Sequence, residues 1–155
     1  LKKAASVSDV KATAADLIGK RALSRRDLER KLQEKGASQA EARYAAEWLE
    51  AIGAINDADY AAILVRHCAG LGYGPARIRE KLREKGVPRE LWDEALERAE
   101  DPAEAIDAFL AKKLGDTPPE DRRAWKRASD ALARRGYAWS DISEGLRHYG
   151  AEWEE

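Results

Sequence analysis

The sequence predicts an all-α protein of three tandem three-helix repeats, stacked into a curved, solenoid-like body. Ala, Leu, Glu, Arg and Lys dominate its 155 residues, and the aromatic residues that favour strands make up only 7%. The chain also matches itself at an offset of 50 residues, which aligns four sets: Leu32, Leu82 and Leu132; Lys35, Lys85 and Arg135; Gly36, Gly86 and Gly136; and Ala46, Leu96 and Leu146. One repeat cannot bury its apolar stripe alone, so neighbouring repeats must stack.

The repeat boundaries follow from the expected helix starts. We predict a flexible start (1–9), a first repeat (10–56), a second repeat (57–100), a third repeat (101–150) and an acidic tail (151–155).

The first repeat should contain helices over residues 10–22, 25–35 and 38–52. Ser24 suits the N-cap of the second helix. Ser38 and Glu41 form a capping-box pattern, in which the serine accepts from the third helical N–H and the glutamate reaches back. Gly36 and Gly53 follow the ends of helices, where a left-handed residue is common.

In the second repeat, Asp57 should cap the first helix. The predicted apolar face of that helix carries Tyr60, Ile63, Leu64, His67 and Leu71. The next helix is a self-contained unit, because Gly74 suits its N-cap, Pro75 its first position and Gly86 its left-handed end. Pro88 then starts a third helix, with its inward residues expected at Leu91, Trp92, Ala95 and Leu96.

The third repeat begins with Asp101 as a cap and Pro102 at the first helical position, and this helix should end near Gly115. Residues 117–120 repeat the same starting pattern and should open a longer helix that reaches Arg135. The stripe of that helix is predicted at Trp125, Ala128 and Leu132. The last helix carries Tyr137, Trp139, Ile142 and Leu146.

Charge follows the same threefold repetition. The middle helices are basic, with five basic against three acidic residues in 25–35, five against two in 77–85 and six against three in 120–135, whereas the third helices are acidic. If the repeats stack in register, one ridge of the body is positive and another is negative. This pattern fits a polarised surface that recognises an extended partner, and it fits an ordinary solvated helical surface equally well.

Catalytic and metal chemistry find little support in the sequence. His67 and Cys68 are neighbours on one helix and supply at most two metal ligands. Gly72 and Gly74 precede a helix, but the preceding strand and the Gly-Lys-Ser/Thr ending of a phosphate loop are missing. We therefore predict no enzyme activity, no metal and no cofactor.

Nucleic-acid recognition has two candidate signals. A helix–turn–helix would use the third helix of a repeat as its recognition helix, but those helices are acidic, which disfavours sequence-specific reading of the major groove. Most of the tryptophans lie on apolar stripes, so we expect core positions rather than base stacking. They are Trp48, Trp92, Trp125 and Trp139, with Trp153 apart in the tail.

Composition limits the partners and the compartment. The formal net charge of −1 argues against a generally basic nucleic-acid binder. The single cysteine, Cys68, excludes an intrachain disulfide and fits a reducing compartment. The sequence has neither an apolar run of about 18 residues nor a signal-peptide core. We expect a monomeric cytoplasmic protein that does not bind membranes.

Four groups of residues form a combined motif. They are residues 22–32 with Lys35 and Gly36; residues 55–61 through Arg66; residues 72–75 with Arg77, Ile78, Leu82, Lys85 and Gly86; and residues 134–137 with Ile142. This combination resembles the RecX family of bacterial regulatory proteins over about residues 17–146. The most specific part is Gly-x-Gly-Pro-x-Arg-Ile joined to Asp-x-x-Tyr-Ala. The family residue before Asp57 is commonly acidic, and it is Asn56 here. The motif residues are Gly36, Asp57, Tyr60, Gly72, Gly74, Pro75, Gly86 and Gly136.

The resemblance implies a non-enzymatic regulator of the RecA recombinase that acts in DNA recombination, repair and the SOS response. It implies binding to RecA, particularly to the RecA filament on single-stranded DNA, along the helical groove of the filament. Inhibition of ATP hydrolysis, strand exchange and co-protease activity would follow.

The basic middle helices are the predicted contact surface for this partner. The predicted residues are Arg25, Arg26, Arg77, Arg79, Arg83 and Arg123. They would make charge-assisted contacts with acidic RecA surface, and a weak direct contact with DNA stays open. Replacing Arg77 and Arg79 by Glu should weaken binding without unfolding, because neither residue lies on the apolar stripe of its helix.

Two other functions stay open from the sequence. One is a DNA-binding helical module that affects recombination indirectly, which should hold bare DNA with a steep salt dependence. The other is a general helical scaffold, which predicts neither interaction.

Overall fold

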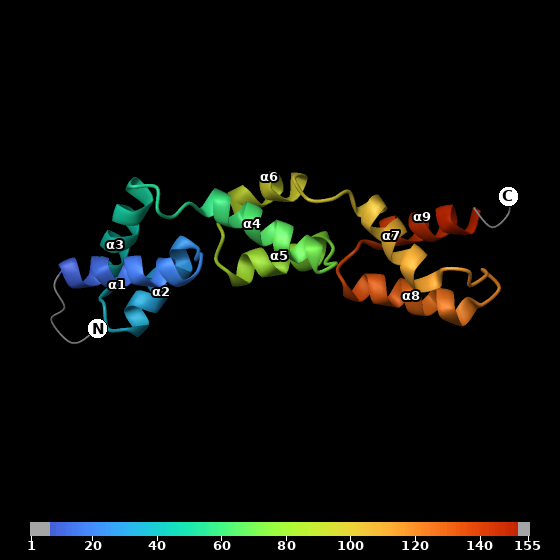
Figure 1. The fold of residues 1–155 in the computed structure, drawn as a ribbon, viewed down its shortest axis with the longest axis horizontal. Coiled ribbons are helices and arrows are strands. Elements are labelled where there is room, and N and C mark those ends of the chain that lie inside the picture. Colours follow the sequence, from blue (N-terminus) through green and yellow to red (C-terminus); the bar gives the residue numbers. More distant parts are fainter. Residues whose placement is uncertain (1–6, 152–155) are drawn as a thin grey trace. The chain divides into compact units, whose positions relative to one another are not determined.

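The computed structural model describes residues 7–151, and the regular elements within this range are all helices, joined by short turns and loops (Figure 1). The elements are α1 (Val7–Lys20), α2 (Arg25–Glu34), α3 (Gln39–Ala51), α4 (Asp57–Gly70), α5 (Pro75–Glu84), the short 3₁₀ helix η1 (Arg89–Leu91), α6 (Trp92–Glu97), α7 (Pro102–Leu114), α8 (Arg122–Arg134) and α9 (Trp139–Ala151). The predicted all-α class, with helices in successive groups of three, is confirmed.

Several predicted helix ends agree with the structure. Ser38 and Glu41 form the capping box, with the Ser38 N–H donating to Glu41 Oε1 at 2.8 Å and the Glu41 N–H donating to Ser38 Oγ at 3.1 Å. Asp101 caps α7 by accepting from the Ala103 N–H at 3.0 Å. Gly53 and Gly86 have φ of 75° and 77°, the left-handed conformation expected where a helix stops.

The prediction for the start of α8 was wrong. Residues 117–120 lie outside the helix, and the Asp121 side chain caps it by accepting from the Ala124 N–H at 3.2 Å. Two consecutive prolines explain the difference, because Pro119 disfavours helical geometry at Pro118. The helix from Pro88 also differs, since its first turn is η1 and only the six residues of α6 continue as an α-helix.

The predicted apolar face of α4 was also wrong. Ile63 and Leu71 are 53% and 52% exposed, and His67 is exposed as well. The buried positions are Ala61, Val65 and Cys68, which follow one another at helical spacing. This helix has apolar residues on two sides, so periodicity alone did not identify the inward side.

The N-cap of α4 is Asn56 rather than Asp57. The Asn56 Oδ1 accepts from the Asp59 N–H at 3.1 Å, and α4 begins at Asp57. An asparagine performs this role as well as an acid does, since capping needs only a side-chain oxygen. The Asp57 carboxylate is therefore available to a different backbone N–H, described below.

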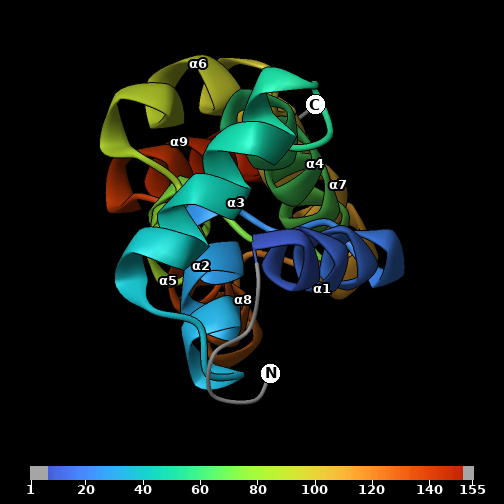
Figure 2. The same cartoon turned by 90° about the vertical axis from the view of Figure 1, so that its left-hand side faces the viewer.

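The chain divides into two compact units. Among the described residues, the first unit contains residues 7–64 together with Lys81–Ala95, and the second contains Val65–Glu80 and residues 96–151. Helices α4 and α5 each contribute residues to both units. Figure 2 looks onto α1, α2 and α3 of the first unit, which run in different directions.

Each unit has its own apolar cluster. In the first, α1, α2 and α3 pack around Leu28, Leu32 and Leu49, which are at most 1% exposed. In the second, α7, α8 and α9 pack around Ile106, Leu110, Leu132 and Ile142, all fully buried. The two middle helices α2 and α8 therefore bury the leucines that the offset of 50 aligned, and Leu82 of α5 is fully buried too.

The tryptophans differ in environment. Trp92 is buried and donates from Nε1 to the Val87 carbonyl at 2.9 Å, and Trp48 and Trp125 are partly buried. Trp139 is 66% exposed, so its predicted core position was wrong. Trp153 and most of the predicted acidic tail lie outside the described residues.

At the other end of the chain, α1 begins at Val7, three residues before its predicted start. Residues 1–6 of the predicted flexible start lie outside the described residues. None of the described helices combines the length and the apolar character that a membrane span requires.

Candidate partner-binding surface

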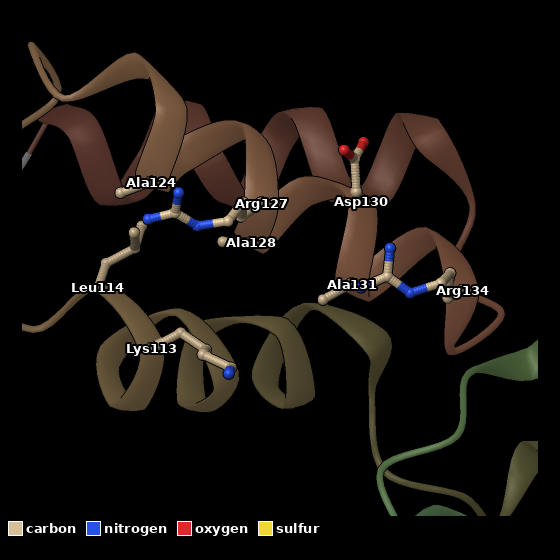
Figure 3. A pocket seen from close by; sticks show the side chains of 8 residues that line it. All are labelled: Lys113, Leu114, Ala124, Arg127, Ala128, Asp130, Ala131 and Arg134. Carbon is tan, nitrogen blue, oxygen red and sulfur yellow. The ribbon is translucent and has the colours of Figure 1, made fainter.

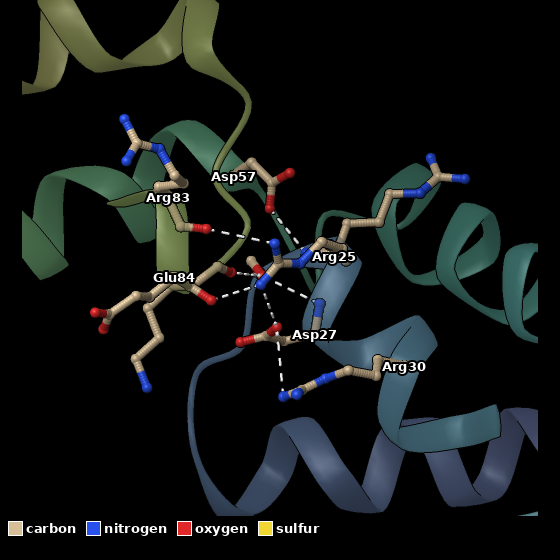
Figure 4. A network of polar contacts seen from close by, with 9 residues as sticks. Arg25, Asp27, Arg30, Asp57, Arg83 and Glu84 are labelled. Atoms are coloured by element: carbon tan, nitrogen blue, oxygen red, sulfur yellow. Dashed lines mark hydrogen bonds and ion pairs between the residues drawn. The ribbon is translucent and has the colours of Figure 1, made fainter. Parts of the chain in front are cut away.

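Within the first unit, the start of α2 is joined to the end of α5 by polar contacts, which we call the first joint (Figure 4). Ser24 is fully buried, and its Oγ donates to the Lys85 carbonyl and accepts from the Asp27 N–H at 3.2 Å. Arg26 donates from Nη2 to the Glu84 carbonyl at 2.5 Å and from Nη1 to the Arg83 carbonyl at 3.4 Å. The Arg83 and Glu84 carbonyls lie at the C-terminal end of α5 and Lys85 directly follows it, where carbonyls lack an N–H donor from a further helical turn. The Arg83 carbonyl also accepts from the Gly86 N–H at 3.0 Å.

Within the second unit, the start of α5 meets the turn after α8 in the same way, and we call these contacts the second joint. The Gly74 N–H donates to the Arg135 carbonyl at 2.6 Å, and the Ala76 N–H donates to the Gly136 carbonyl at 3.1 Å. Arg77 donates from Nη1 to the Arg134 carbonyl at 3.4 Å, and its guanidinium lies 4.2 Å from the centre of the Tyr73 ring.

The two joints keep the register of 50 residues. Ser24 and Gly74 are 50 positions apart, and so are the carbonyls that they bind, on Lys85 and Arg135. The donor changes from a side-chain hydroxyl to a backbone N–H. Glycine is required at Gly74, because a Cβ there would lie 2.6 Å from the carbonyl carbon of Gly136. The Gly-x-Gly-Pro motif thus forms a contact between the start of α5 and the turn after α8.

Arg25 is occupied within the first unit. Its guanidinium makes ion pairs with Glu50 at 3.1 Å, Glu47 at 3.5 Å and Glu29 at 3.8 Å, and its side chain is 25% exposed. Its backbone N–H donates to Asp57 Oδ1 at 2.9 Å. Arg25 therefore ties α2 to α3 and to the start of α4.

The carboxyl group of Asp57 is half-buried beside Arg25. Burial raises its pKa above the ordinary value of 3.8, and the negative charge of Glu50 adds to the rise. The hydrogen bond from the Arg25 N–H and the charge of Arg25 act in the opposite direction without cancelling it.

The other three predicted arginines lie at the surface. Arg79, Arg83 and Arg123 are all exposed. The Arg83 guanidinium lies 5.8 Å from the centre of the Trp92 ring, and Arg123 has no ion pair with another described residue. Among the six predicted residues, Arg25, Arg26 and Arg77 thus make hydrogen bonds or ion pairs with other elements of the fold, although Arg26 is also exposed.

Three of the remaining motif residues are glycines in turns, and the other two, Pro75 and Tyr60, lie in helices. Gly36, Gly72 and Gly136 have φ of 106°, 87° and 96°, which L side chains rarely adopt. Pro75 is the first residue of α5. Tyr60, on α4, lines a shallow cavity of about 240 Å³ in the first unit.

Sequence reasoning missed a basic groove between α7 and α8 in the second unit, which exposed Lys113, Arg127 and Arg134 flank. The excess of basic residues in 120–135 was the available signal, but it did not point to one side of the helix. Among residues 7–151 no three His, Cys, Asp or Glu side chains converge as a metal site would require.

Comparison with known proteins decides the family. The model of the second three-helix domain of RecX matches residues 56–96, and that of the third three-helix domain matches residues 99–146. The chain belongs to the RecX family. It is 34% identical over 138 residues to the regulatory protein RecX of Pseudomonas entomophila (strain L48), covering 88% of this chain and 89% of that one. A second relative, the regulatory protein RecX of Stenotrophomonas maltophilia (strain R551-3), is 34% identical over 136 residues, with 87% and 83% covered.

Solved RecX structures share the fold. The crystal structure of RecX from Lactobacillus salivarius superposes with a TM-score of 0.82 at 20% identity, over 92% of this chain and 95% of that one. Another crystal structure of regulatory protein RecX superposes with a TM-score of 0.70 at 25% identity, over 89% and 73%. The chain is therefore a RecX-type protein of three-helix domains, in a family of regulatory proteins.

Proposed function

We propose that this protein binds RecA and its filament on single-stranded DNA, and that it inhibits ATP hydrolysis, strand exchange and co-protease activity. The observation that supports the proposal is membership of the RecX family over nearly the whole length of a relative at 34% identity. The protein acts by binding and not by catalysis, in the control of recombination and repair.

We place the contact on the solvent-facing arginines of the middle helices. Arg79 and Arg83 of α5 and Arg123 of α8 can reach a partner, whereas Arg25, Arg26 and Arg77 serve the fold. Arg77→Glu would also remove the hydrogen bond to the Arg134 carbonyl in the second joint, so Arg77 is left out of the variant that tests the contact surface.

The direct test is ATP hydrolysis by RecA on single-stranded DNA, with the protein added at sub-stoichiometric and equal ratios. We expect inhibition that grows with the ratio. An unchanged rate of hydrolysis at both ratios would contradict the proposal.

The contact surface is tested with the double variant Arg79→Glu and Arg83→Glu. We expect it to bind the filament at least about tenfold more weakly, because two cations become anions at an interface built on charge. Arg43→Glu is the matched control, since Arg43 is an exposed arginine of α3 outside the middle helices. If the control and the double variant bind the filament equally well, Arg79 and Arg83 do not belong to the contact surface.

Competition between the RecA filament and naked single-stranded DNA at physiological salt separates this function from a DNA-binding module. A filament binder prefers RecA bound to DNA. Equal or tighter binding to naked DNA, with a steep salt dependence, would favour the module instead.

A further inference from the structure

The groove between α7 and α8 has an apolar floor with no aromatic side chain (Figure 3). It encloses about 410 Å³. The floor consists of Leu114 and Ala128, which are both 4% exposed, together with the partly buried Ala124 and Ala131. Three alanines along one side of α8 leave room for a chain to lie close to the helix.

The rim of this groove is positive. Lys113 comes from α7, and Arg127 and Arg134 come from α8; all three are exposed, and none has an ion pair with another described residue. The one acid on the rim, Asp130, is paired with Lys126 at 3.2 Å. In Figure 3 the Asp130 carboxylate points away from Lys113. The groove therefore offers three uncompensated cations to an anionic partner.

The floor favours an acidic protein segment over nucleic acid. Proteins that hold single strands without sequence preference stack the bases on aromatic rings, and none lines this groove. Trp125 of α8 does not line the groove. Its Nε1 donates to the Thr117 carbonyl at 3.3 Å, and the centre of its ring lies 5.8 Å from the centre of the Tyr149 ring. Alanine and leucine side chains instead suit the small apolar side chains of a peptide.

We propose that the groove between α7 and α8 binds an acidic segment of a partner protein, whose carboxylates pair with Arg127, Arg134 and Lys113 while its small apolar side chains cover the alanines. Arg127 and Arg134 are two helical turns apart, or about 10 Å along α8. Carboxylates seven residues apart on a partner helix have this spacing. Each arginine can hold a carboxylate through two N–H groups.

The test is binding of a dye-labelled helical peptide to the full chain, followed by fluorescence anisotropy. The peptide carries two glutamates seven residues apart among alanines and leucines, and a second peptide carries glutamines in their place. We expect the glutamate peptide to bind at least about fivefold more tightly than the glutamine peptide, and its affinity to fall with added salt.

Two neighbouring lysines provide matched variants. Lys113 lines the groove, whereas the exposed Lys112 does not, and both lie in the last turn of α7. Lys113→Glu and Arg127→Glu should each weaken binding about fivefold or more, and Lys112→Glu should change it less than twofold. Circular dichroism checks that each variant is folded; if Lys113→Glu unfolds, Lys113→Gln replaces it and should weaken binding more than Lys112→Gln.

Two results would overturn the proposal. One is equal binding of the two peptides, or equal effects of the variants at Lys112 and Lys113. The other is an oligothymidine strand that binds in a manner sensitive to Lys113 and Arg127 and that the glutamate peptide cannot displace. The proposal does not depend on which protein supplies the segment. A negative result in the RecA ATPase assay would therefore contradict the proposed function alone, and a negative result in the peptide assay would contradict the groove proposal alone.

Discussion

Arg25 shows how a charged residue can be committed to the fold while its sequence position suggests a binding site. Arg25 carries three carboxylate neighbours, and its backbone N–H holds Asp57 Oδ1. A partner that bound the Arg25 guanidinium would have to displace those carboxylates first. We therefore expect substitutions of Arg25 to act through stability before they act through binding.

The raised pKa of Asp57 predicts a pH dependence with a definite sign. Because the folded pKa lies above the ordinary 3.8, the folded protein binds more protons than the unfolded chain between these two values. The contribution of Asp57 to the free energy of unfolding therefore falls as the pH rises through this window, and the cost persists at neutral pH.

Asp57→Asn keeps the oxygen that accepts from the Arg25 N–H and removes the charge. Relative to wild type, we expect the variant to gain stability as the pH rises from about 3 to 7, by less than about 1 kcal/mol in all after solvent screening. Urea unfolding at several pH values measures this gain. Asp59→Asn is the control, since Asp59 is an exposed acid in the same first turn of α4 and loses the same interaction with the helix terminus. Parallel pH profiles for the two variants would contradict the prediction.

At the residue scale, local signals were predictable and distant ones were not. The capping box of Ser38 and Glu41 links residues three positions apart, so the sequence contains the whole interaction. The hydrogen bonds of Arg26 join residues 57 and 58 positions apart, and no local pattern encodes such partners. For the same reason the sequence could not separate Arg25, Arg26 and Arg77 from Arg79, Arg83 and Arg123.

At the scale of helices, the second joint depends on glycine at the turn after α8. Gly136 has φ of 96°, and a Cβ on it would lie 2.5 Å from the backbone nitrogen of Arg77. Two costs therefore coincide at this position. The left-handed conformation disfavours any L side chain, and the start of α5 leaves no room for one.

Gly136→Ala should lower the free energy of unfolding by about 2–4 kcal/mol, the sum of backbone strain and overpacking. Gly53→Ala is the matched control, because Gly53 has φ of 75° and nothing within 4 Å of the added Cβ. We expect this control to lose about 1 kcal/mol, from the backbone alone. Urea unfolding followed by circular dichroism compares the two variants. Equal losses would show that the close approach to Arg77 does not affect the free energy of unfolding.

Helix boundaries were predictable where capping residues decide them, whereas the buried face of a helix was not predictable where apolar residues lie on two of its sides. Asp101, Pro102 and Gly115 bounded α7 as expected. Helix α4 carries Ile63, Leu64 and Val65 in succession, so two faces look equally apolar in the sequence. Packing against neighbouring helices, which the sequence does not display, buried Val65 and left Ile63 exposed.

At the scale of the whole molecule, a net charge of −1 coexists with basic middle helices and acidic third helices. Charges of this kind act over about a Debye length, which is near 10 Å at 0.1 M salt and 3 Å at 1 M. An interaction through Arg79 and Arg83 should therefore depend strongly on salt although the protein as a whole is nearly neutral.

We expect binding to the RecA filament to weaken roughly tenfold between 0.05 M and 0.5 M NaCl. The double variant Arg79→Glu and Arg83→Glu should show a shallower dependence, because it has lost the attractive charges. Titrations at four or more salt concentrations measure both slopes. If the wild-type affinity did not change with salt, apolar contacts and not the arginines would hold the partner.

The sequence predicted the repeated order of helices from its period, but the two compact units do not follow that period. The period reports which helices are equivalent and not which of them pack most closely. The boundaries proposed at residues 57 and 101 stay a prediction of the repeat, as does the monomeric state.

The joints also have a consequence for the order in which the chain folds. The capping box closes a loop of three residues, whereas the contact of Ser24 with Lys85 spans 61 residues and that of Arg77 with Arg134 spans 57. Longer loops cost more entropy to close, so the local helical turns form first. During synthesis the N-terminus emerges first, and α1, α2 and α3 can pack on one another while residue 85 is still inside the ribosome. Until the end of α5 has been synthesised, the Ser24 hydroxyl is exposed to water. It becomes buried when it donates its hydrogen bond to the Lys85 carbonyl.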